Sequence, residues 1–275
     1  MTFVHVNGAE IPALGFGTFE IHGSKAEEMT HHALEVGYRH IDTAQAYENE
    51  AEVGQAIERS PVDRNEVFLT TKLLPQDFGR RDLPVAMERS LDQLGTDYVD
   101  LVLLHWPNPQ VPMADTMEAL QEVREAGHAR HIGVSNFTVA LLHEALEHSD
   151  VPLVTNQVEY HPFLSQAPVL DVARANGMSL TAYSPLAKGD VAKDDTLQRI
   201  GDAHGKTAAQ VGLRWLIQQD RVIAIPKTAN PERCETNLQI FDFELSDDEM
   251  QQIHNLARPD GRYVNPPGLA PEWDT

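Results

Sequence analysis

Eight short apolar runs alternate with segments of helical periodicity along this chain, and this alternation limits its fold more than any other feature. In the intervening segments apolar residues recur every three or four positions, the period of an amphipathic helix. A regular succession of strand and helix predicts an α/β fold, here an eight-stranded parallel (β/α)8 TIM barrel. The expected strands lie near residues 13–17, 38–42, 67–72, 99–105, 130–134, 153–158, 178–183 and 222–225. The expected helices lie near residues 24–36, 48–59, 80–94, 114–126, 138–147, 166–176, 195–218 (a pair) and 231–238.

Both ends of the chain add elements to this barrel. Phe3–Val6, Asn7-Gly8 and Glu10–Pro12 predict an N-terminal β-hairpin, because Asn-Gly favours the tight turn between antiparallel strands. Ser246 with Glu249 three residues later is typical of a helix start, so we expect an extra C-terminal helix near 246–256. The last residues, rich in Pro and Gly, cannot form a regular helix.

The composition favours one domain in a reducing compartment. With 275 residues and 41% hydrophobic content, the chain can form one large α/β domain over residues 1–275, although length alone also permits two small ones. No run of 18 apolar residues and no signal-peptide pattern is present, and Cys234 is the lone cysteine. We therefore expect a cytoplasmic protein without a membrane span.

The net charge of −21 limits the partners of this chain. It argues against a nucleic-acid or anionic-membrane surface. The acidity is explained either by an ordinary solvated surface or by adaptation to a salty cytoplasm. In both cases an anionic cofactor needs a local basic pocket, and lysines are scarce.

Several motifs of nucleotide and metal sites are incomplete. After Gly15 and Gly17 the dinucleotide fingerprint G-x-G-x-x-G fails, because Glu20 occupies the place of the third glycine. His143 and His148 stand five residues apart and would face different sides of a helix, so a zinc site is not supported. We expect no metal.

Four polar residues do form a consistent set. Asp42, Lys72 and His105 each close a predicted strand, and Tyr47 lies one loop after Asp42. In a (β/α)8 barrel the carboxyl ends of the strands meet at one mouth, where active sites lie. A Lys72 ammonium held by Asp42 would lower the pKa of Tyr47 and make it a proton donor, while a neutral His105 could hydrogen-bond a carbonyl oxygen. The set predicts a pocket that reduces C=O and needs a hydride source.

Each of these residues also has an ordinary structural explanation. Asp42 could cap a helix, Tyr47 could be a surface aromatic, Lys72 could be an edge lysine and His105 could be a satisfied structural histidine. The functional interpretation therefore depends on the four occurring together at one barrel mouth.

Longer motifs resemble a known family. The segments GYRHIDTAQAYENEAEVGQAI, FLTTK, DYVDLVLLHWP, IGVSNF and IPKT are similar to those of the aldo-keto reductases, and within that family to the bacterial diketogluconate and methylglyoxal reductase group. The resemblance covers essentially the whole chain. It implies a (β/α)8 barrel that reduces a small-molecule carbonyl substrate with NADPH, and it implies that Asp42, Tyr47, Lys72 and His105 are the catalytic tetrad.

The resemblance also implies roles for other residues. Ser135, Asn136 and Gln157 would hold the nicotinamide carboxamide, and Tyr183 would stack under the ring. Gly17 and Thr18 belong to the segment beside the cofactor, which ends in Phe19, a pocket wall with Trp106 and Trp273. The pyrophosphate path would be lined by Ser184, Pro185 and Leu186, and the adenosine 2′-phosphate and adenine would be held by Lys227, Thr228, Arg233 and Asn237.

Two departures from the family pattern concern the cofactor. Asn230 and Thr236 stand where many relatives carry Arg and Glu, so some use of NADH is compatible with the expected NADPH preference. The function expected is reduction of 2-oxoaldehydes such as methylglyoxal and of diketo sugar acids by a monomer. The alternatives are a xylose-type sugar-aldehyde reductase with dual cofactor use and a non-catalytic NADPH-sensing subunit. We also expect Leu269 or Trp273 of the tail to pack near the mouth.

Overall fold

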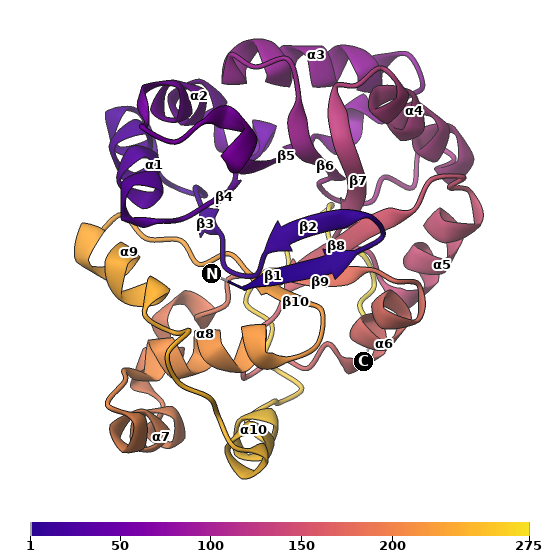
Figure 1. Ribbon diagram of the computed structural model, residues 1–275. Coiled ribbons are helices and arrows are strands. Elements are labelled where there is room, and N and C mark those ends of the chain that lie inside the picture. The colour runs from indigo at the N-terminus through magenta and orange to yellow at the C-terminus, as the bar shows by residue number, and fades with distance from the viewer. Residues whose placement is uncertain (1, 275) are drawn as a thin grey trace.

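The structure is a computed structural model that describes residues 2–274, and it contains the predicted barrel (Figure 1). Eight parallel strands are hydrogen-bonded in chain order. They are β3 (Phe16–Gly17), β4 (His40–Asp42), β5 (Phe68–Leu73), β6 (Val99–Leu104), β7 (Ala129–Ser135), β8 (Leu153–Glu159), β9 (Ser179–Tyr183) and β10 (Val222–Ala224). Each lies within or beside its predicted run, so the predicted fold class is confirmed.

The helices surround the strands as an outer layer (Figure 1). Their buried faces are apolar, as with Met29, Ala33 and Leu34 of α1, because one stripe of each helix packs on the barrel. Short 3₁₀ turns follow several strands, among them η1 (Gln45–Tyr47), η4 (Ala187–Gly189) and η5 (Val191–Lys193). The helices are α1 (Ser24–Val36), α2 (Glu50–Arg59), α3 (Asp82–Leu94), α4 (Met113–Glu125), α5 (Val139–Glu147), α6 (Ala167–Ala175), α7 (Asp195–His204), α8 (Ala208–Gln218), α9 (Pro231–Leu238) and α10 (Asp247–His254).

The extra C-terminal helix α10 begins as the sequence indicates. The Ser246 hydroxyl accepts a hydrogen bond from the Glu249 backbone N–H, and the Glu249 side chain accepts one from the Ser246 backbone N–H. Two of the otherwise unpaired N–H groups at this helix start are thus satisfied.

The first and last strands close the barrel. Gly15 N–H donates to Ala224 O at 2.8 Å, Ala224 N–H donates to Ala13 O at 2.9 Å, and Gly17 N–H donates to Pro226 O at 3.0 Å. A side chain at position 15 would overlap the His40 ring, since a Cβ there would lie 2.8 Å from it. Glycine therefore allows the close approach that completes the ring.

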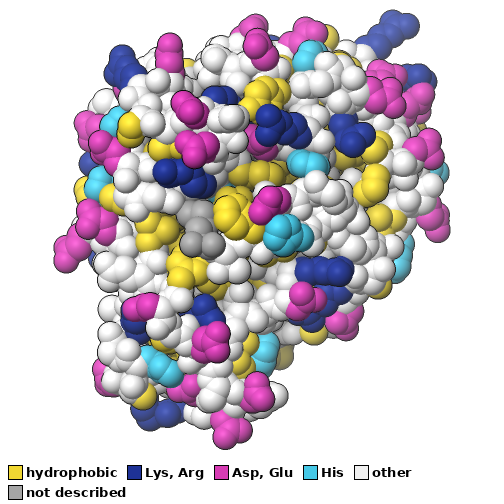
Figure 2. Space-filling model, in the orientation of Figure 1, with side chains coloured by type: hydrophobic (Ala, Val, Ile, Leu, Met, Phe, Trp, Pro, Cys, Tyr) yellow, Lys and Arg dark blue, Asp and Glu magenta, His cyan; other side chains and the backbone are white. Residues whose placement is uncertain are grey.

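The N-terminal hairpin covers one end of the barrel. Its strands β1 (Phe3–Val6) and β2 (Ala9–Pro12) pair around the predicted Asn7-Gly8 turn and lie across the strand amino ends (Figure 1). Val6, Ala9 and Ile11 pack with a small apolar cluster inside the barrel that includes Leu101 and Ile223. The space-filling view of this end shows acidic side chains interspersed with basic ones and with histidines (Figure 2). The carboxyl ends of the strands lie at the opposite end of the barrel.

No helix among residues 2–274 is long and apolar enough to cross a membrane. In the same residues no group of three or more His, Cys, Asp or Glu side chains is arranged to hold a metal ion.

Candidate active site

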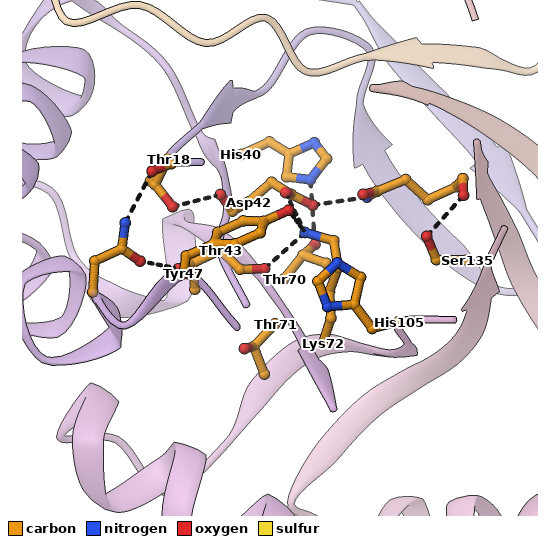
Figure 3. Close-up of polar contacts among 12 residues, drawn as sticks. Thr18, His40, Asp42, Thr43, Tyr47, Thr70, Thr71, Lys72, His105 and Ser135 are labelled. Atoms are coloured by element: carbon orange, nitrogen blue, oxygen red, sulfur yellow. Dashed lines mark hydrogen bonds and ion pairs between the residues drawn. The ribbon is translucent and has the colours of Figure 1, made fainter. Parts of the chain in front are cut away.

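The structure brings the four predicted residues together at the carboxyl ends of neighbouring strands (Figure 3). Asp42 ends β4, Lys72 is the last residue but one of β5, and His105 follows β6 directly. Tyr47 lies in η1, the turn after β4. Because adjacent parallel strands present their ends at one edge, residues far apart in sequence become neighbours here.

The Lys72 ammonium is the centre of this site (Figure 3). Its Nζ donates to Asp42 Oδ1 at 2.5 Å, to the Thr43 carbonyl at 2.8 Å and to the Tyr47 hydroxyl oxygen at 3.1 Å. An ammonium has three N–H donors, so all are engaged. Since Lys72 donates to the Tyr47 oxygen, the phenol's own proton remains available to another acceptor.

Asp42 is hydrogen-bonded through both its carboxylate and its backbone carbonyl. Its Oδ2 accepts a hydrogen bond from the Gln157 side-chain amide at 2.8 Å, and its backbone carbonyl accepts from the Thr18 hydroxyl and the Thr18 N–H at 3.0 Å. A buried carboxylate is stable only when its oxygens are paired. Gln157, expected at the nicotinamide carboxamide, thus also orients the carboxylate that faces Lys72.

The pKa of Lys72 is raised above its ordinary value. Burial alone would lower it, but the Asp42 charge, followed by that of Tyr47, outweighs this effect and favours the ammonium. Lys72 is therefore charged although it is fully buried.

The expected lowering of the Tyr47 pKa is wrong for this structure. Burial raises the pKa of Tyr47, and the Lys72 ammonium opposes this increase without reversing it. The sequence does not show how deeply the phenol is buried, and desolvation of the phenolate dominates. Tyr47 therefore keeps its proton at neutral pH, and Lys72 is placed to stabilise the anion once the proton leaves.

His105 is neutral. Burial, followed by repulsion from the Lys72 charge, lowers the pKa of His105 to about 3. Its Nδ1 is buried without a hydrogen-bond partner among the described residues, and its ring meets that of Tyr47 edge-on, with centroids 5.7 Å apart. A neutral imidazole beside the phenol can hydrogen-bond a carbonyl oxygen.

This shift predicts a pH dependence of stability. Between about pH 6.5 and pH 3 the unfolded chain binds a proton at His105 that the folded protein excludes, so stability is lost as the pH falls through this window. The slope from this group is about 1.4 kcal/mol per pH unit. Urea unfolding of the wild type and of His105→Gln from pH 7 to pH 4 checks it. The wild type should lose stability more steeply, and parallel curves would contradict the shifted pKa.

The residues expected around a nicotinamide lie beside this site. Ser135 Oγ donates to the Gln157 carbonyl at 2.8 Å, and the Asn136 amide nitrogen donates to the His105 carbonyl at 2.9 Å. The Tyr183 hydroxyl donates to Asn136 Oδ1 at 2.8 Å, and burial raises its pKa far above the ordinary value. The half-buried Tyr183 ring is a neutral flat surface suited to stacking.

The residues expected at the pyrophosphate and adenosine follow the last two strands. Ser184 has a left-handed backbone, with φ 46°, as β9 leads into a loop with Pro185 and Leu186. Lys227 is close to Gly17, with which it forms an isolated bridge, and its ammonium lies 3.9 Å from Glu20. Thr228 precedes α9 and is buried. Arg233 and Asn237 belong to α9, where Arg233 is exposed and Asn237 is buried.

The expected pocket walls differ in exposure. Phe19 is 52% exposed and packs edge-on against Tyr47, with centroids 5.1 Å apart. Trp106 is buried and faces Trp273 of the tail at 6.1 Å between centroids. Leu269 is 43% exposed. Trp273 of the tail is therefore in contact with Trp106 in the segment after β6.

Sequence reasoning missed Asn49, which organises the first loop of the site. Its side chain donates to the carbonyls of Thr18 and Ile21 at 2.9 and 2.8 Å and accepts from the Thr43 hydroxyl at 2.8 Å. It thereby fixes the loop that carries Phe19. The available signal was a polar residue immediately before a predicted helix, which is common and not specific.

Known proteins confirm the class that this fold and site define. The Aldo/keto reductase family profile matches residues 13–258, so the chain belongs to this family of oxidoreductases. It is 41% identical to a glyoxal reductase of Bacillus subtilis (96% of this chain, 95% of that protein). It is 40% identical to the methylglyoxal reductase DkgB of Escherichia coli O157:H7 (96% and 99%).

A solved structure is more similar still. A crystal structure provisionally assigned as a 2,5-diketo-D-gluconic acid reductase B is 54% identical, with a TM-score of 0.98 over 100% of this chain and 98% of that one. The predicted resemblance to this bacterial group is confirmed.

Proposed function

We propose that this protein reduces aldehydes and ketones with NADPH, and that its substrates are 2-oxoaldehydes such as methylglyoxal and diketo sugar acids. The observation that carries this is the Lys72 ammonium, with one of its three hydrogen bonds on the Tyr47 oxygen, beside a neutral His105. The similarity to glyoxal, methylglyoxal and diketogluconate reductases supports the substrate classes.

The side chains then have distinct roles. His105 and the Tyr47 hydroxyl hydrogen-bond the substrate carbonyl oxygen and polarise the carbon. As negative charge develops on that oxygen, Tyr47 donates its proton, and the Lys72 ammonium stabilises the phenolate that remains. Asp42 keeps Lys72 charged and oriented. A bound reduced nicotinamide supplies the hydride.

The residues present fit such a cofactor. Ser135 Oγ and Asn136 Oδ1 each accept one hydrogen bond within the chain and can accept a second from a carboxamide, beside the flat face of Tyr183. Arg233 is exposed, and no ion pair among the described residues engages its guanidinium, so it can bind a phosphate. Lys227 is partly balanced by Glu20, which is compatible with some use of NADH.

Arg233→Ala should weaken NADPH binding by ~1.5–3 kcal/mol, the range for hydrogen bonds to charged groups, because the adenosine 2′-phosphate loses a charged donor. Binding of NADH, which lacks this phosphate, should weaken much less. Dissociation constants for both cofactors, from quenching of tryptophan fluorescence, check this. Equal losses would place Arg233 outside the phosphate site.

We further propose that residues 1–275 act as one domain and as a monomer, since Asp42, Tyr47, Lys72 and His105 meet at the mouth of a single barrel. The free, buried Cys234 suits a reducing compartment such as the cytoplasm. Purified protein mixed with NADPH and methylglyoxal, followed by the loss of NADPH absorbance, tests the central claim. Binding of NADPH without turnover of any carbonyl would instead support a cofactor-sensing subunit.

A further inference from the structure

Arg262, in the tail segment after α10, has an unexplained guanidinium group. Its side chain is only 15% exposed, and Nη1 is buried without a hydrogen-bond partner among residues 2–274. A guanidinium carries five N–H donors, and a buried donor left unpaired is costly and rare. Nη1 itself faces Glu159, whereas the other N–H groups of the guanidinium make no hydrogen bond within residues 2–274 and are not fully buried, so they are the donors that a ligand can reach.

Two neighbours hold Arg262 without satisfying it. The guanidinium lies over the Trp273 ring, 3.7 Å from the centroid, and its Nη1 is 3.8 Å from Glu159 Oε2, too far for a hydrogen bond. The Glu159 oxygens are already occupied by the backbone N–H groups of Tyr263 and Val264, at 2.8 and 2.9 Å, and Oε1 also lies 3.1 Å from His161 Nε2. Glu159 therefore balances the charge of Arg262 through the buried Nη1 and accepts no hydrogen bond from the guanidinium.

Arg262 lies beside the candidate active site. Trp273, on which it stacks, packs against Trp106, the residue after His105. Arg262 is also near enough to Tyr183 for its charge to oppose the effect of burial on that pKa. Arg262 thus lies between Tyr183, the ring proposed to stack on the nicotinamide, and Trp106, an expected wall of the substrate pocket.

We propose that Arg262 binds a carboxylate of the substrate, which makes keto acids, rather than neutral aldehydes, the preferred substrates of this mouth. This inference rests on the proposed reductase function. It adds that the substrate is negatively charged and that Arg262 recognises this charge. The planar fork of a guanidinium matches the two oxygens of a carboxylate. Lys72 cannot take this role, because all of its donors are engaged.

A purely structural role for Arg262 explains less. The tail is already attached by contacts that do not use the guanidinium donors: Tyr263 and Val264 through Glu159, the Tyr263 hydroxyl to Asp190 at 2.7 Å, and Asp274 to the Val139 N–H at 2.8 Å. The overall charge of −21 adds a second reason, since an anionic substrate approaching such a protein needs a local cation.

The test compares Arg262→Gln with the wild type on a charged and an uncharged substrate, 2,5-diketo-D-gluconate and methylglyoxal. We expect kcat/KM for the acid to fall ~10–100-fold, mainly through KM, as for the loss of a charge-assisted hydrogen bond. For methylglyoxal it should remain within about threefold. Arg258→Gln is the matched control, because Arg258 lies in the same tail and stacks on Phe163 but is half exposed; both substrates should be unaffected. Arg262→Lys, which keeps the charge without the fork, should be intermediate.

Binding of gluconate to the NADP⁺-loaded protein can be measured without turnover. The Arg262 guanidinium lies over the Trp273 ring, so a ligand on the guanidinium changes the fluorescence of Trp273. Gluconate should quench the fluorescence of the wild type and of Arg258→Gln, but not of Arg262→Gln. Equal losses of kcat/KM on both substrates, or unchanged gluconate binding in Arg262→Gln, would overturn the proposal. A wild type that binds gluconate but reduces no carbonyl would refute the reductase function and leave the carboxylate site standing.

Discussion

Tyr47→Phe is expected to lower kcat by at least ~10²-fold, the lower end of the contribution of general acid catalysis. The substitution removes the one hydroxyl to which Lys72 donates and leaves the ring, with its contacts to Phe19 and His105, in place. The proton for the product oxygen must then come from water. Single-turnover measurements with NADPH and methylglyoxal give the chemical rate directly.

The affinity for NADPH serves as the control in this experiment. Because the predicted cofactor contacts come from other residues, the dissociation constant of NADPH should be nearly unchanged in Tyr47→Phe. Turnover close to that of the wild type would refute Tyr47 as the proton donor.

Lys72→Met should be as damaging to catalysis, for a different reason. Without the ammonium, burial and the negative charge of Asp42 act unopposed on Tyr47, so its pKa rises further and the phenolate loses its stabilising charge. The variant also leaves the buried Asp42 carboxylate without its ion-pair partner, which typically costs 3–5 kcal/mol of stability. We therefore expect both a severe loss of kcat and a lower free energy of unfolding.

The pH–rate profile separates these two effects. If Lys72 sets the pKa of Tyr47, the residual activity of Lys72→Met has an altered pH dependence. If the variant is only less stable, its activity measured at a lower temperature, where it is folded, has the wild-type pH dependence. Lys193→Met, which removes an exposed lysine, is the matched control and should change neither quantity. Substantial activity with an unchanged profile would show that Lys72 does not act on Tyr47.

Much of this arrangement could be predicted from sequence, because in a (β/α)8 barrel the place of a residue within its strand determines whether it lies at the mouth. A polar residue at the end of an apolar run is placed at the barrel mouth whatever its neighbours are. This rule identifies Asp42, Lys72 and His105, and the structure brings them together with Tyr47. The same logic applies to Glu159, which ends the apolar run of β8, but no partner for it was evident in the sequence.

What escaped prediction depends on burial and on distant contacts. The direction of the Tyr47 pKa shift is decided by desolvation, which follows from packing and not from the motif. The link between Glu159 and Arg262 joins residues about a hundred positions apart, through a tail without regular structure. Neither a period nor a motif indicates where such a tail will lie.

The closure of the barrel between its first and last strands has a consequence for the order in which the protein becomes functional. Gly17 and Pro226, joined by a hydrogen bond of 3.0 Å, belong to opposite ends of the chain, and the proposed phosphate-binding residues follow directly after Pro226. During synthesis the catalytic residues up to His105 emerge long before Lys227 and Arg233. A chain that stops before its last strand therefore carries the four catalytic candidates but lacks Lys227 and Arg233, so we expect it to be unable to bind NADPH.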